Sequence, residues 1–493
     1  MWVLYAVSAY LLALVGLNAL VLSLMLLVRG RRPIPAVPPV ADETWPRVLV
    51  QLPVFNERHV VERLVEAVTA LDYPRDRLYV QLLDDSTDDT EHIAAAAVAR
   101  ARELGLDIAH IRRDDRVGFK AGALAYGLTL CDAEFVAIFD ADFVPQPGFL
   151  KMLLPHLLAD EHVGMVQARW AHINAGYSHL TRAQALALDS HFAVEQPARH
   201  RNGLLMNFSG TAGIWRTRCI NASGGWDLNT LSEDIDLSYR AQLSGWRFLY
   251  LPEVGVPGEI PPLMMGFKRQ QARWATGTVQ CLRKLGPHVL GSQLTLWQKV
   301  QAMLHLGGYL IHPLMLLTVL LALPMTLSGG FKLLPLAGLG LAMIGPPLQT
   351  LLAQRRLYPD WPRRLLNFPV LMLLGTGIAV SNTQAVLRGM SDRPQAFVRT
   401  PKFQLGEHRG SWAASQYTLP LDAITFLEGL FSLYAAVTAV LAFTRVPALA
   451  PFMILYALGF AYVAGTSVIQ ALVARRTQAQ ARTLHLGSAS STR

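Results

Sequence analysis

The chain has 493 residues, enough for one sizeable soluble domain and a membrane part. Hydrophobic residues make up 52% of it and charged residues only 16%, which is too apolar for an ordinary soluble chain of this length. The net charge of +9 predicts positive loops beside a membrane, a site for anionic phosphates, or both, and requires no nucleic-acid partner. The three cysteines form no CxxC pair, so neither a disulfide framework nor a zinc ribbon is indicated.

The first expected element is a membrane-spanning helix. Residues 1–28 contain no charged side chain and exceed the roughly 20 residues that cross a bilayer. They lack the basic start and the short apolar run of a cleavable signal peptide. Arg29, Arg31 and Arg32 follow at once, which predicts that the next residues are cytoplasmic. Residues 1–32 are therefore expected to form an N-terminal transmembrane helix.

Residues 45–260 have soluble character, and apolar runs alternate in them with helical patterns. The runs at 48–52, 78–83, 108–111 and 135–139 are expected strands. The alternation predicts an α/β domain with a mostly parallel, Rossmann-like sheet that is covered on both faces. Ligands of such sheets bind beyond the carboxyl ends of the strands.

Polar residues follow these expected strand ends: Asn56, Glu57, Asp84, Asp85, Asp140 and Asp142. Asp140 and Asp142 are two residues apart, so both can approach Mg²⁺ or Mn²⁺, which prefer hard oxygen ligands and leave positions for phosphate oxygens. A single Asp-x-Asp motif is weak support for a metal site, because loop aspartates that face solvent are commoner.

The segment after the second strand and the start of a later helix both suggest donor binding. Asp84 and Asp85 could bond the hydroxyls and base edge of a nucleoside, whereas Asp88 and Asp89 have an ordinary explanation as helix-capping acids. Lys120 begins a helix, where a cation opposes the helix dipole. A bound phosphate would compensate for that charge.

Ser232, Glu233 and Asp234 open an expected helix that ends near Leu243. Ser232 can cap this helix, and acids are common in a first turn, so helix capping alone explains all three. The same helix N-terminus keeps a carboxylate ionised, as a general base for a sugar hydroxyl requires.

An amphipathic helical stretch, residues 261–290, precedes the later apolar segments. Gln270, Arg273 and Trp274 are spaced at i, i+3 and i+4 and share a face of it. Arg273 can bind a pyrophosphate and Trp274 can stack on a sugar, although such residues also anchor interfacial helices among lipid headgroups.

The C-terminal region, residues 300–475, is expected to be a multi-span membrane domain. Its candidate spans are residues 302–327, 333–353, 421–443 and 448–473. Residues 365–387 contain several polar side chains and have basic flanks, which predicts an interfacial or re-entrant segment. We expect five crossings; six would place the basic 388–409 loop outside, against the charge rule.

Eight motifs occur in an order that resembles a known family. They are VFNE at 54–57, LDDSTD at 83–88, KAGAL at 120–124, FDADF at 139–143, VQARW at 166–170, GTAG at 210–213, ED at 233–234 and QxxRW at 270–274. The set resembles the family 2 inverting glycosyltransferases, which have a GT-A fold. It is most similar to the plant cellulose synthase-like A glucomannan 4-β-mannosyltransferases, and it also resembles bacterial cellulose synthase. The resemblance covers about residues 45–290.

The resemblance implies a role for each matching residue. Asp234 would be the catalytic base, and the metal, Mg²⁺ or Mn²⁺, would be held on the donor diphosphate by Asp142 with Asp140. Donor binding is implied for Asn56, Glu57, Asp84, Asp85, Lys120, Asp140 and Arg273. Acceptor binding is implied for Gln270, Trp274, Gly210 and Thr211, of which Gln270 would also contact the donor. Ser209 and Ser232 depart from the plant pattern, and Ser209 lies at the acceptor wall.

The loop at residues 388–415 is similar to the cytoplasmic gating loop of cellulose synthases. Its segment 396–403 matches the motif Phe-x-Val-Thr-x-Lys apart from changes at Val398 and Arg399. The resemblance suggests a gating role for Thr400 and Lys402, and it favours the cytoplasmic placement of this loop that the charge pattern predicts.

The leading interpretation is a processive β-glycosyltransferase. It would transfer a hexose from GDP-mannose or UDP-glucose to a growing β-linked polysaccharide that leaves through the membrane. A glycolipid synthase of the ceramide- or diacylglycerol-glucosyltransferase type, with a lipid acceptor, is the alternative. A transporter or scaffold with a degenerate domain is disfavoured, because every expected carboxylate is present. We expect a multi-pass protein of a bacterial cytoplasmic membrane with its catalytic domain in the cytosol, in contact with membrane lipids; a partner subunit stays open.

Overall fold

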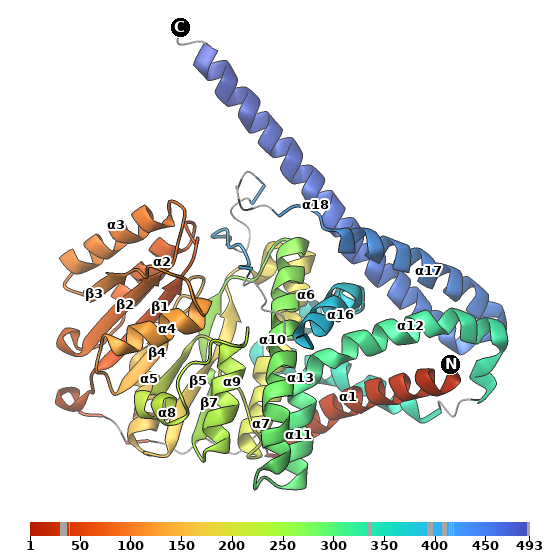
Figure 1. Cartoon of the computed structure of the whole chain (residues 1–493), viewed down its shortest axis with the longest axis horizontal. Helices are drawn as coiled ribbons and strands as arrows, with labels where there is room; N and C mark the ends of the chain where they lie inside the picture. The colour runs from red at the N-terminus through yellow and green to blue at the C-terminus, as the bar shows by residue number, and fades with distance from the viewer. Residues whose placement is uncertain are drawn as a thin grey trace.

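The computed structural model describes residues 1–29, 37–38, 40–333, 337–391, 398–406, 412–413, 415, 417 and 419–490. An α/β domain lies on one side of the molecule and a group of long helices on the other (Figure 1). The long helix α10, Met264–Gly291, stands between the two parts. The cysteines Cys131, Cys219 and Cys281 are unbridged.

A seven-stranded sheet forms the centre of the α/β domain, in the order β3-β2-β1-β4-β6-β5-β7. Its strands are β1 Val48–Val54, β2 Leu78–Asp84, β3 Asp107–Ile111, β4 Phe135–Ile138, β5 Val163–His172, β6 Gly213–Arg216 and β7 Arg247–Gly258. Strand β6 pairs antiparallel with β4 and β5, and every other pairing is parallel. The predicted α/β fold with a mostly parallel sheet is confirmed.

Helices cover both faces of the sheet, because most strand residues are apolar on both sides. One face packs against α2 Val61–Thr69, α3 Thr90–Glu103 and α5 Phe149–Leu158. The other packs against α4 Phe119–Thr129, α8 Thr217–Ala222 and α9 Glu233–Leu243. Helices α6 His179–Ser190 and α7 Gln196–Arg201 are joined by a π-helical turn, His191–Glu195.

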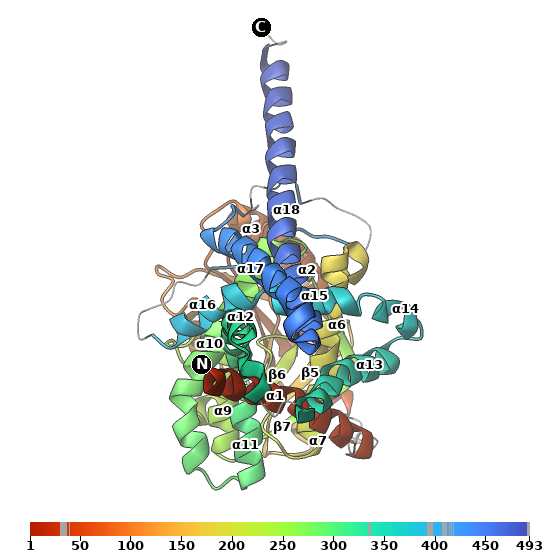
Figure 2. The same cartoon turned by 90° about the vertical axis from the view of Figure 1, so that its right-hand side faces the viewer.

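Four helical segments are long and apolar enough to cross a membrane, among the described residues: Trp2–Val28, Gly308–Ser328, Ala423–Arg445 and Pro447–Gln480. They belong to α1 Trp2–Arg29, α12 Ile311–Ser328 with the turn before it, α17 Ala423–Arg445 and α18 Ala450–Ser490. Viewed from their own side, these helices lie in front of the sheet (Figure 2).

The expected span at 333–353 is not one helix. Residues 334–336 lie outside the described part of the chain, a 3₁₀ helix covers Ala337–Ile344, and α13 Gly345–Leu357 follows. Pro346 and Pro347 explain the break, since a proline has no N–H to bond to the preceding turn.

The stretch predicted to be interfacial or re-entrant, 365–387, is bent. Helices α14 Trp361–Leu365 and α15 Phe368–Gly377 meet α16 Ala379–Gly389 at an angle of 45°. The bend fits a broken span or a re-entrant segment, so the membrane placement of this stretch stays a prediction. Helix α11 Leu296–Leu306 follows α10.

Candidate active site

One cavity lies beyond the carboxyl ends of β1, β2, β4 and β5, where the sheet topology predicts a ligand site. Helix α10 and the segment 399–402 complete its wall. Most of the predicted site residues line it: Glu57, Asp85, Lys120, Asp140, Asp142, Gly210, Asp234, Gln270, Arg273, Trp274, Thr400 and Lys402. Acids and bases that lie far apart in the chain therefore face one space.

Lys120 joins three segments of this wall. Its ammonium group lies 2.5 Å from Asp140 Oδ1 and 3.8 Å from Glu233 Oε1, and it donates a hydrogen bond to the carbonyl of Gly210 at 2.8 Å. Burial alone would lower the pKa of Lys120, but Asp140 and Glu233 outweigh it, so the pKa of Lys120 is raised. Lys120 stays cationic at neutral pH and can bind a phosphate.

Asp234 lies in the first turn of α9, beside Lys120. Burial and the neighbouring Glu233 raise its pKa to about 7, against the opposing effect of Lys120. Gly210 approaches Asp234 closely: its φ is +81°, and a Cβ there would lie 3.2 Å from Asp234 Oδ2. A carboxyl group that titrates near neutral pH is suited to take a proton from a sugar hydroxyl.

Ser232 occupies the N-cap position of α9, but its side chain makes no capping hydrogen bond. It packs instead against α10, where a Cβ at Gly277 would lie 2.2 Å from Ser232 Oγ. The expected capping bond is therefore absent, because close packing of α9 on α10 determines where this hydroxyl points.

Asp140 and Asp142 face the cavity just beyond strand β4. Lys402 Nζ lies 2.6 Å from Asp142 Oδ2 and 2.5 Å from the Glu259 carbonyl. In the described part of the chain no cluster of three or more His, Cys, Asp or Glu could hold a metal. Two carboxylates can nevertheless hold Mg²⁺ or Mn²⁺ when phosphates supply further ligands. In this structure each carboxylate is paired with an ammonium group, Asp140 with Lys120 and Asp142 with Lys402.

Residues 399–402 close the cavity on the side of Glu57. Arg399 lies 3.0 Å from Glu57 and stacks on the ring of Tyr417, 4.0 Å from its centroid. The phenol of Tyr417 in turn bonds Asp88. Burial, with help from Asp142 and against Arg399, raises the pKa of Glu57 to about 8. Residues 392–397, 407–411 and 414 of the predicted gating loop lie outside the described residues.

Asn56, Asp84 and Thr211 do not line the cavity, but they hold the neighbouring backbone and side chains, and Thr211 contacts the lining residue Asp140. Asp84 accepts hydrogen bonds from His110, at 2.8 Å, and from the Ser86 N–H, at 2.9 Å. Asn56 accepts one from the Thr87 N–H at 2.8 Å, and Thr211 Oγ1 accepts one from the Asp140 N–H at 2.9 Å.

The sequence analysis missed two arginines that follow β3. Arg113 binds Asp85 through two hydrogen bonds, of 3.0 and 2.5 Å. Arg116 lines the cavity, and its guanidinium lies 3.2 Å from the centroid of the Phe55 ring. Their position just after an expected strand was the available signal, because the carboxyl ends of neighbouring parallel strands share one edge.

Aromatic rings from β5 and α10 also line the cavity. The ring centroids of Trp170 and Trp274 are 6.5 Å apart, and Trp170 stacks on Phe192 at 5.0 Å. Gln270, Arg273 and Trp274 all reach the cavity from one face of α10, as their spacing predicted.

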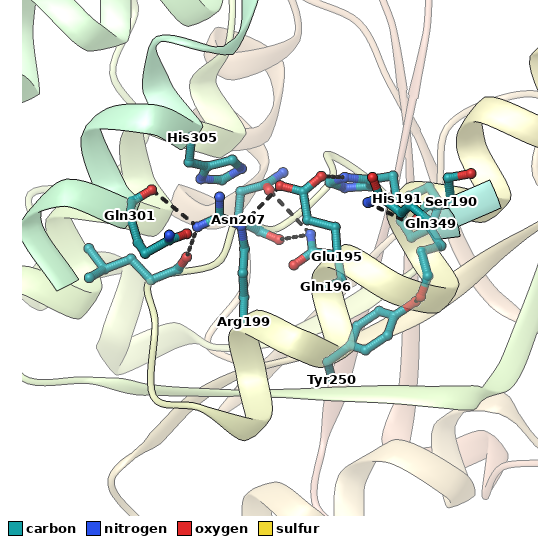
Figure 3. A network of polar contacts seen from close by, with 12 residues as sticks. Ser190, His191, Glu195, Gln196, Arg199, Asn207, Tyr250, Gln301, His305 and Gln349 are labelled. Atoms are coloured by element: carbon teal, nitrogen blue, oxygen red, sulfur yellow. Dashed lines mark hydrogen bonds and ion pairs between the residues drawn. The ribbon is translucent and has the colours of Figure 1, made fainter. Parts of the chain in front are cut away.

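A polar network joins the π-helical turn to its surroundings, and it includes Glu195, Arg199 and Tyr250 (Figure 3). Tyr250 donates a hydrogen bond to the Phe192 carbonyl at 2.6 Å, and Glu195 binds both His191 and Arg199 at 3.0 Å. Burial would raise the pKa of Glu195, but His191 and Arg199 outweigh it and hold that pKa well below its usual range.

The network also reaches the neighbouring helices. Arg199 donates to the carbonyl of Gln301 on α11 at 3.4 Å, and the Gln301 side chain donates to Asn18 on α1 at 2.7 Å. Tyr239 on α9 bonds His305 on α11 at 2.7 Å. The helix that carries Asp234, the aromatic wall and the first apolar helix are thereby tied together.

A mostly parallel sheet with an Asp-x-Asp at a strand end, faced by an acid at a helix start, defines a GT-A-type glycosyltransferase domain. Residues 46–277 match the family described as "Glycosyltransferase like family 2". This part of the chain is therefore a family 2 glycosyltransferase domain.

The curated proteins that match this chain belong to the group that its sequence motifs resemble. Glucomannan 4-beta-mannosyltransferase 1 of Oryza sativa subsp. japonica is 41% identical over 53% of this chain and 51% of its own length. Glucomannan 4-beta-mannosyltransferase 2 of Arabidopsis thaliana is 42% identical over 53% of this chain and 50% of its own. The chain spans about half the length of the curated relatives it matches.

Among solved structures, the mannosyltransferase PcManGT from Pyrobaculum calidifontis, in complex with GDP-Man and Mn2+, is similar with a TM-score of 0.50 and 20% identity. The match covers 79% of this chain and 100% of PcManGT. At this level of identity the likeness bears on the fold alone.

Proposed function

We propose that the chain is an inverting β-hexosyltransferase that extends a β-linked polysaccharide with hexose from a nucleotide sugar. One observation carries this proposal: Asp234, Lys120, Asp140, Asp142, Arg273 and Trp274 face a single cavity. A base, a phosphate-binding cation, a pair of metal-binding carboxylates and a sugar-stacking ring are the parts that such a transfer needs.

The relatives support a mannosyl donor. The two plant proteins are named as glucomannan mannosyltransferases. GDP-mannose is therefore the first donor to test, and UDP-glucose the second.

The transfer is a single displacement at the anomeric carbon. Asp234 removes the proton from the acceptor hydroxyl, and the acceptor oxygen forms a bond to C1 as the bond from C1 to the phosphate oxygen breaks. The electron pair leaves with the nucleoside diphosphate, whose negative charge Arg273 and Lys120 stabilise. Attack from the opposite face inverts the configuration at C1.

Asp140 and Asp142 would hold Mg²⁺ or Mn²⁺ at the donor diphosphate. The ion would neutralise charge that develops on the leaving phosphate. Lys402 contacts the same carboxylate of Asp142, so this lysine must move aside or share Asp142 when an ion binds.

The apolar helices support a placement at the membrane. In the part of the chain that the structure describes, four segments long enough to cross a bilayer lie beyond α10, and Trp274 is on α10 itself. We infer that the catalytic domain faces the cytosol, where nucleotide sugars are made, and that the product leaves between the helices. The basic residues Arg355, Arg356, Arg363 and Arg364 beside the helices favour this orientation.

The test is a product analysis with the purified full chain in lipid nanodiscs. The protein is incubated with GDP-mannose, UDP-glucose and other nucleotide sugars in the presence of Mg²⁺ or Mn²⁺, and the products are analysed by mass. We expect a ladder of β-linked hexoses from one donor. A lipid with a single sugar would support the glycolipid-synthase alternative instead, and no transfer from any donor would reject both.

A further inference from the structure

His172 is a cavity residue to which the proposed mechanism gives no role. It is the last residue of β5, two positions after Trp170, so the two side chains lie on the same face of the strand. Both line the cavity. Asn174 holds the strand end to the chain after β7 with two hydrogen bonds to Ile260, both of 2.8 Å, so the backbone that carries His172 is fixed.

A buried carboxylate orients the His172 ring. His172 Nε2 lies 3.0 Å from Oδ1 of Asp189, which is 0% exposed. Asp189 lies on α6 and is itself held by α13, through the Gln354 amide at 2.8 Å and by Tyr358 of the same segment at 3.3 Å. Helices α6 and α13 pack against each other beside β5 (Figure 2). Three donors therefore converge on one carboxylate.

This arrangement determines which ring nitrogen is available to a ligand. A carboxylate only accepts hydrogen bonds, so Nε2 carries the proton and donates it to Asp189. Among the described residues, the His172 ring has no hydrogen-bond partner other than Asp189. The second nitrogen, Nδ1, is then left for a molecule in the cavity, and in the neutral ring it is an acceptor.

The surroundings of His172 are those of a sugar site. Trp170 and Trp274 offer flat apolar faces, and the side chain of Leu188 on α6 completes this side of the cavity. Asp234 lines the same cavity. A sugar ring stacked on a tryptophan exposes its hydroxyls at the ring edge, where a directed nitrogen can bind them.

We propose that His172 binds a hydroxyl group of the acceptor sugar through Nδ1, and that Asp189 is the positioning residue that fixes its tautomer and orientation. The proposal rests on the proposed function and adds to it a determinant of acceptor binding. Its ligand is a hexose unit at the non-reducing end of a β-linked oligosaccharide. The His172 side chain is 3% exposed and borders the cavity.

The experiment separates acceptor binding from donor binding in the full chain in nanodiscs. The probes are short β-1,4-linked mannose and glucose oligosaccharides as acceptors, and the nucleoside diphosphates as donor analogues. The variants are His172→Phe, which keeps a ring and removes the nitrogen, His172→Asn, whose amide can reach the position of Nδ1, and Asp189→Asn. His162→Ala is the control, because His162 is exposed at the opposite end of β5.

We expect His172→Phe to raise the acceptor KM, and the acceptor Kd measured by calorimetry without donor, about tenfold. The nucleotide Kd and the rate of donor hydrolysis by water stay within about twofold of the wild type. His172→Asn recovers part of the acceptor affinity. Asp189→Asn is expected to raise the acceptor KM and Kd as His172→Phe does, because the new amide can donate a hydrogen bond to Nε2 and so favour the other tautomer of His172. His162→Ala changes none of these quantities.

An unchanged acceptor KM and Kd in His172→Phe overturns the proposal. So does a nucleotide Kd that weakens as much as the acceptor Kd, or a loss of acceptor affinity that follows a fall in the unfolding temperature. A failure of the proposed function would look different, because the wild type itself would then transfer no hexose from any of the donors. Acceptor affinity is still measurable in that case, and a wild type that binds none of the oligosaccharides would overturn this inference as well.

Discussion

Lys402 Nζ lies 2.6 Å from Asp142 Oδ2, a contact between residues that are 260 positions apart in the chain. Asp142 is one of the two carboxylates that we propose as ligands of a divalent cation, and the ammonium group of Lys402 is paired with it in this structure. On that proposal, the segment 399–402 and a metal ion would compete for one side chain.

Removal of this ammonium group is expected to strengthen metal binding. In Lys402→Met the carboxylate of Asp142 loses its competitor, so the Kd for Mn²⁺ of the nucleotide-free protein should fall about tenfold, as titration calorimetry would measure. Lys151→Met is the matched control, because Lys151 pairs with Asp72 on the surface at 2.8 Å. Equal or weaker Mn²⁺ affinity in Lys402→Met would show that the ion does not use Asp142.

The rate of transfer is expected to depend on the protonation of Asp234. Because burial and Glu233 raise the pKa of Asp234 to about 7, kcat should fall about tenfold per pH unit below that value and level off above it. Asp234→Asn should lower kcat by roughly 10²–10⁴-fold and leave nucleotide affinity unchanged. Asp72→Asn, on the surface, serves as the control. Loss of nucleotide binding in Asp234→Asn would contradict the role of a base.

The same pKa predicts a change in stability. A carboxyl group with a folded-state pKa above its ordinary value of 3.8 stabilises the fold while it is protonated, and this contribution disappears as the pH rises through about 7. Asp234→Asn should therefore unfold at a higher temperature than the wild type at pH 8, with no difference near pH 4. Thermal unfolding at several pH values tests this, and a variant less stable at pH 8 would refute it.

Gly210 is expected to be required for its small size as well as for its backbone conformation. In Gly210→Ala the new Cβ would lie 3.2 Å from Asp234 Oδ2 and 3.4 Å from Lys120 Nζ, so kcat/KM should fall at least about tenfold. Gly203→Ala separates the two effects: its φ is +64°, but nothing lies within 4 Å of its Cβ. It should lose about 1 kcal/mol of stability and keep its activity. Equal activity in both variants would mean that the contact with Asp234 is unimportant.

Arg199 is expected to contribute strongly to stability. Its side chain is 1% exposed and is paired with Glu195, so Arg199→Met leaves a partly buried carboxylate without this partner and should cost about 3 kcal/mol. The double variant with Glu195→Gln should recover part of the loss. Arg247→Met, which breaks the exposed pair with Asp160, should cost at most about 1 kcal/mol. Chemical unfolding measures all three, and equal losses in the two single variants would contradict the assignment.

The positions of the strand ends could be predicted from the sequence, because buried strands of a parallel sheet are continuous apolar runs and their carboxyl ends share one edge. That placed Glu57, Asp85, Asp140 and Asp142 on one side of the domain. The helical spacing of Gln270 and Trp274 likewise predicted their shared face.

Which member of a neighbouring pair faces the ligand could not be predicted. Asp84 and Asp85 are adjacent at a strand end, where successive side chains point in opposite directions. Only the positions of His110 on β3 and of Arg113 after it decide that Asp84 is held inside and Asp85 lines the cavity. The missing capping bond of Ser232 has the same kind of cause, since contact with Gly277 determines the direction of the hydroxyl.

The sequence by itself determined the α/β class of the catalytic domain, the apolar segments and the residue types of the site, because periodicity and composition are local properties of a chain. Tertiary structure alone decided the ion pair of Lys402 with Asp142, the pairing of His172 with Asp189 and the elevated pKa of Asp234. These depend on distances between side chains from different elements and on their removal from water, and neither quantity is encoded in the spacing of residues along the chain.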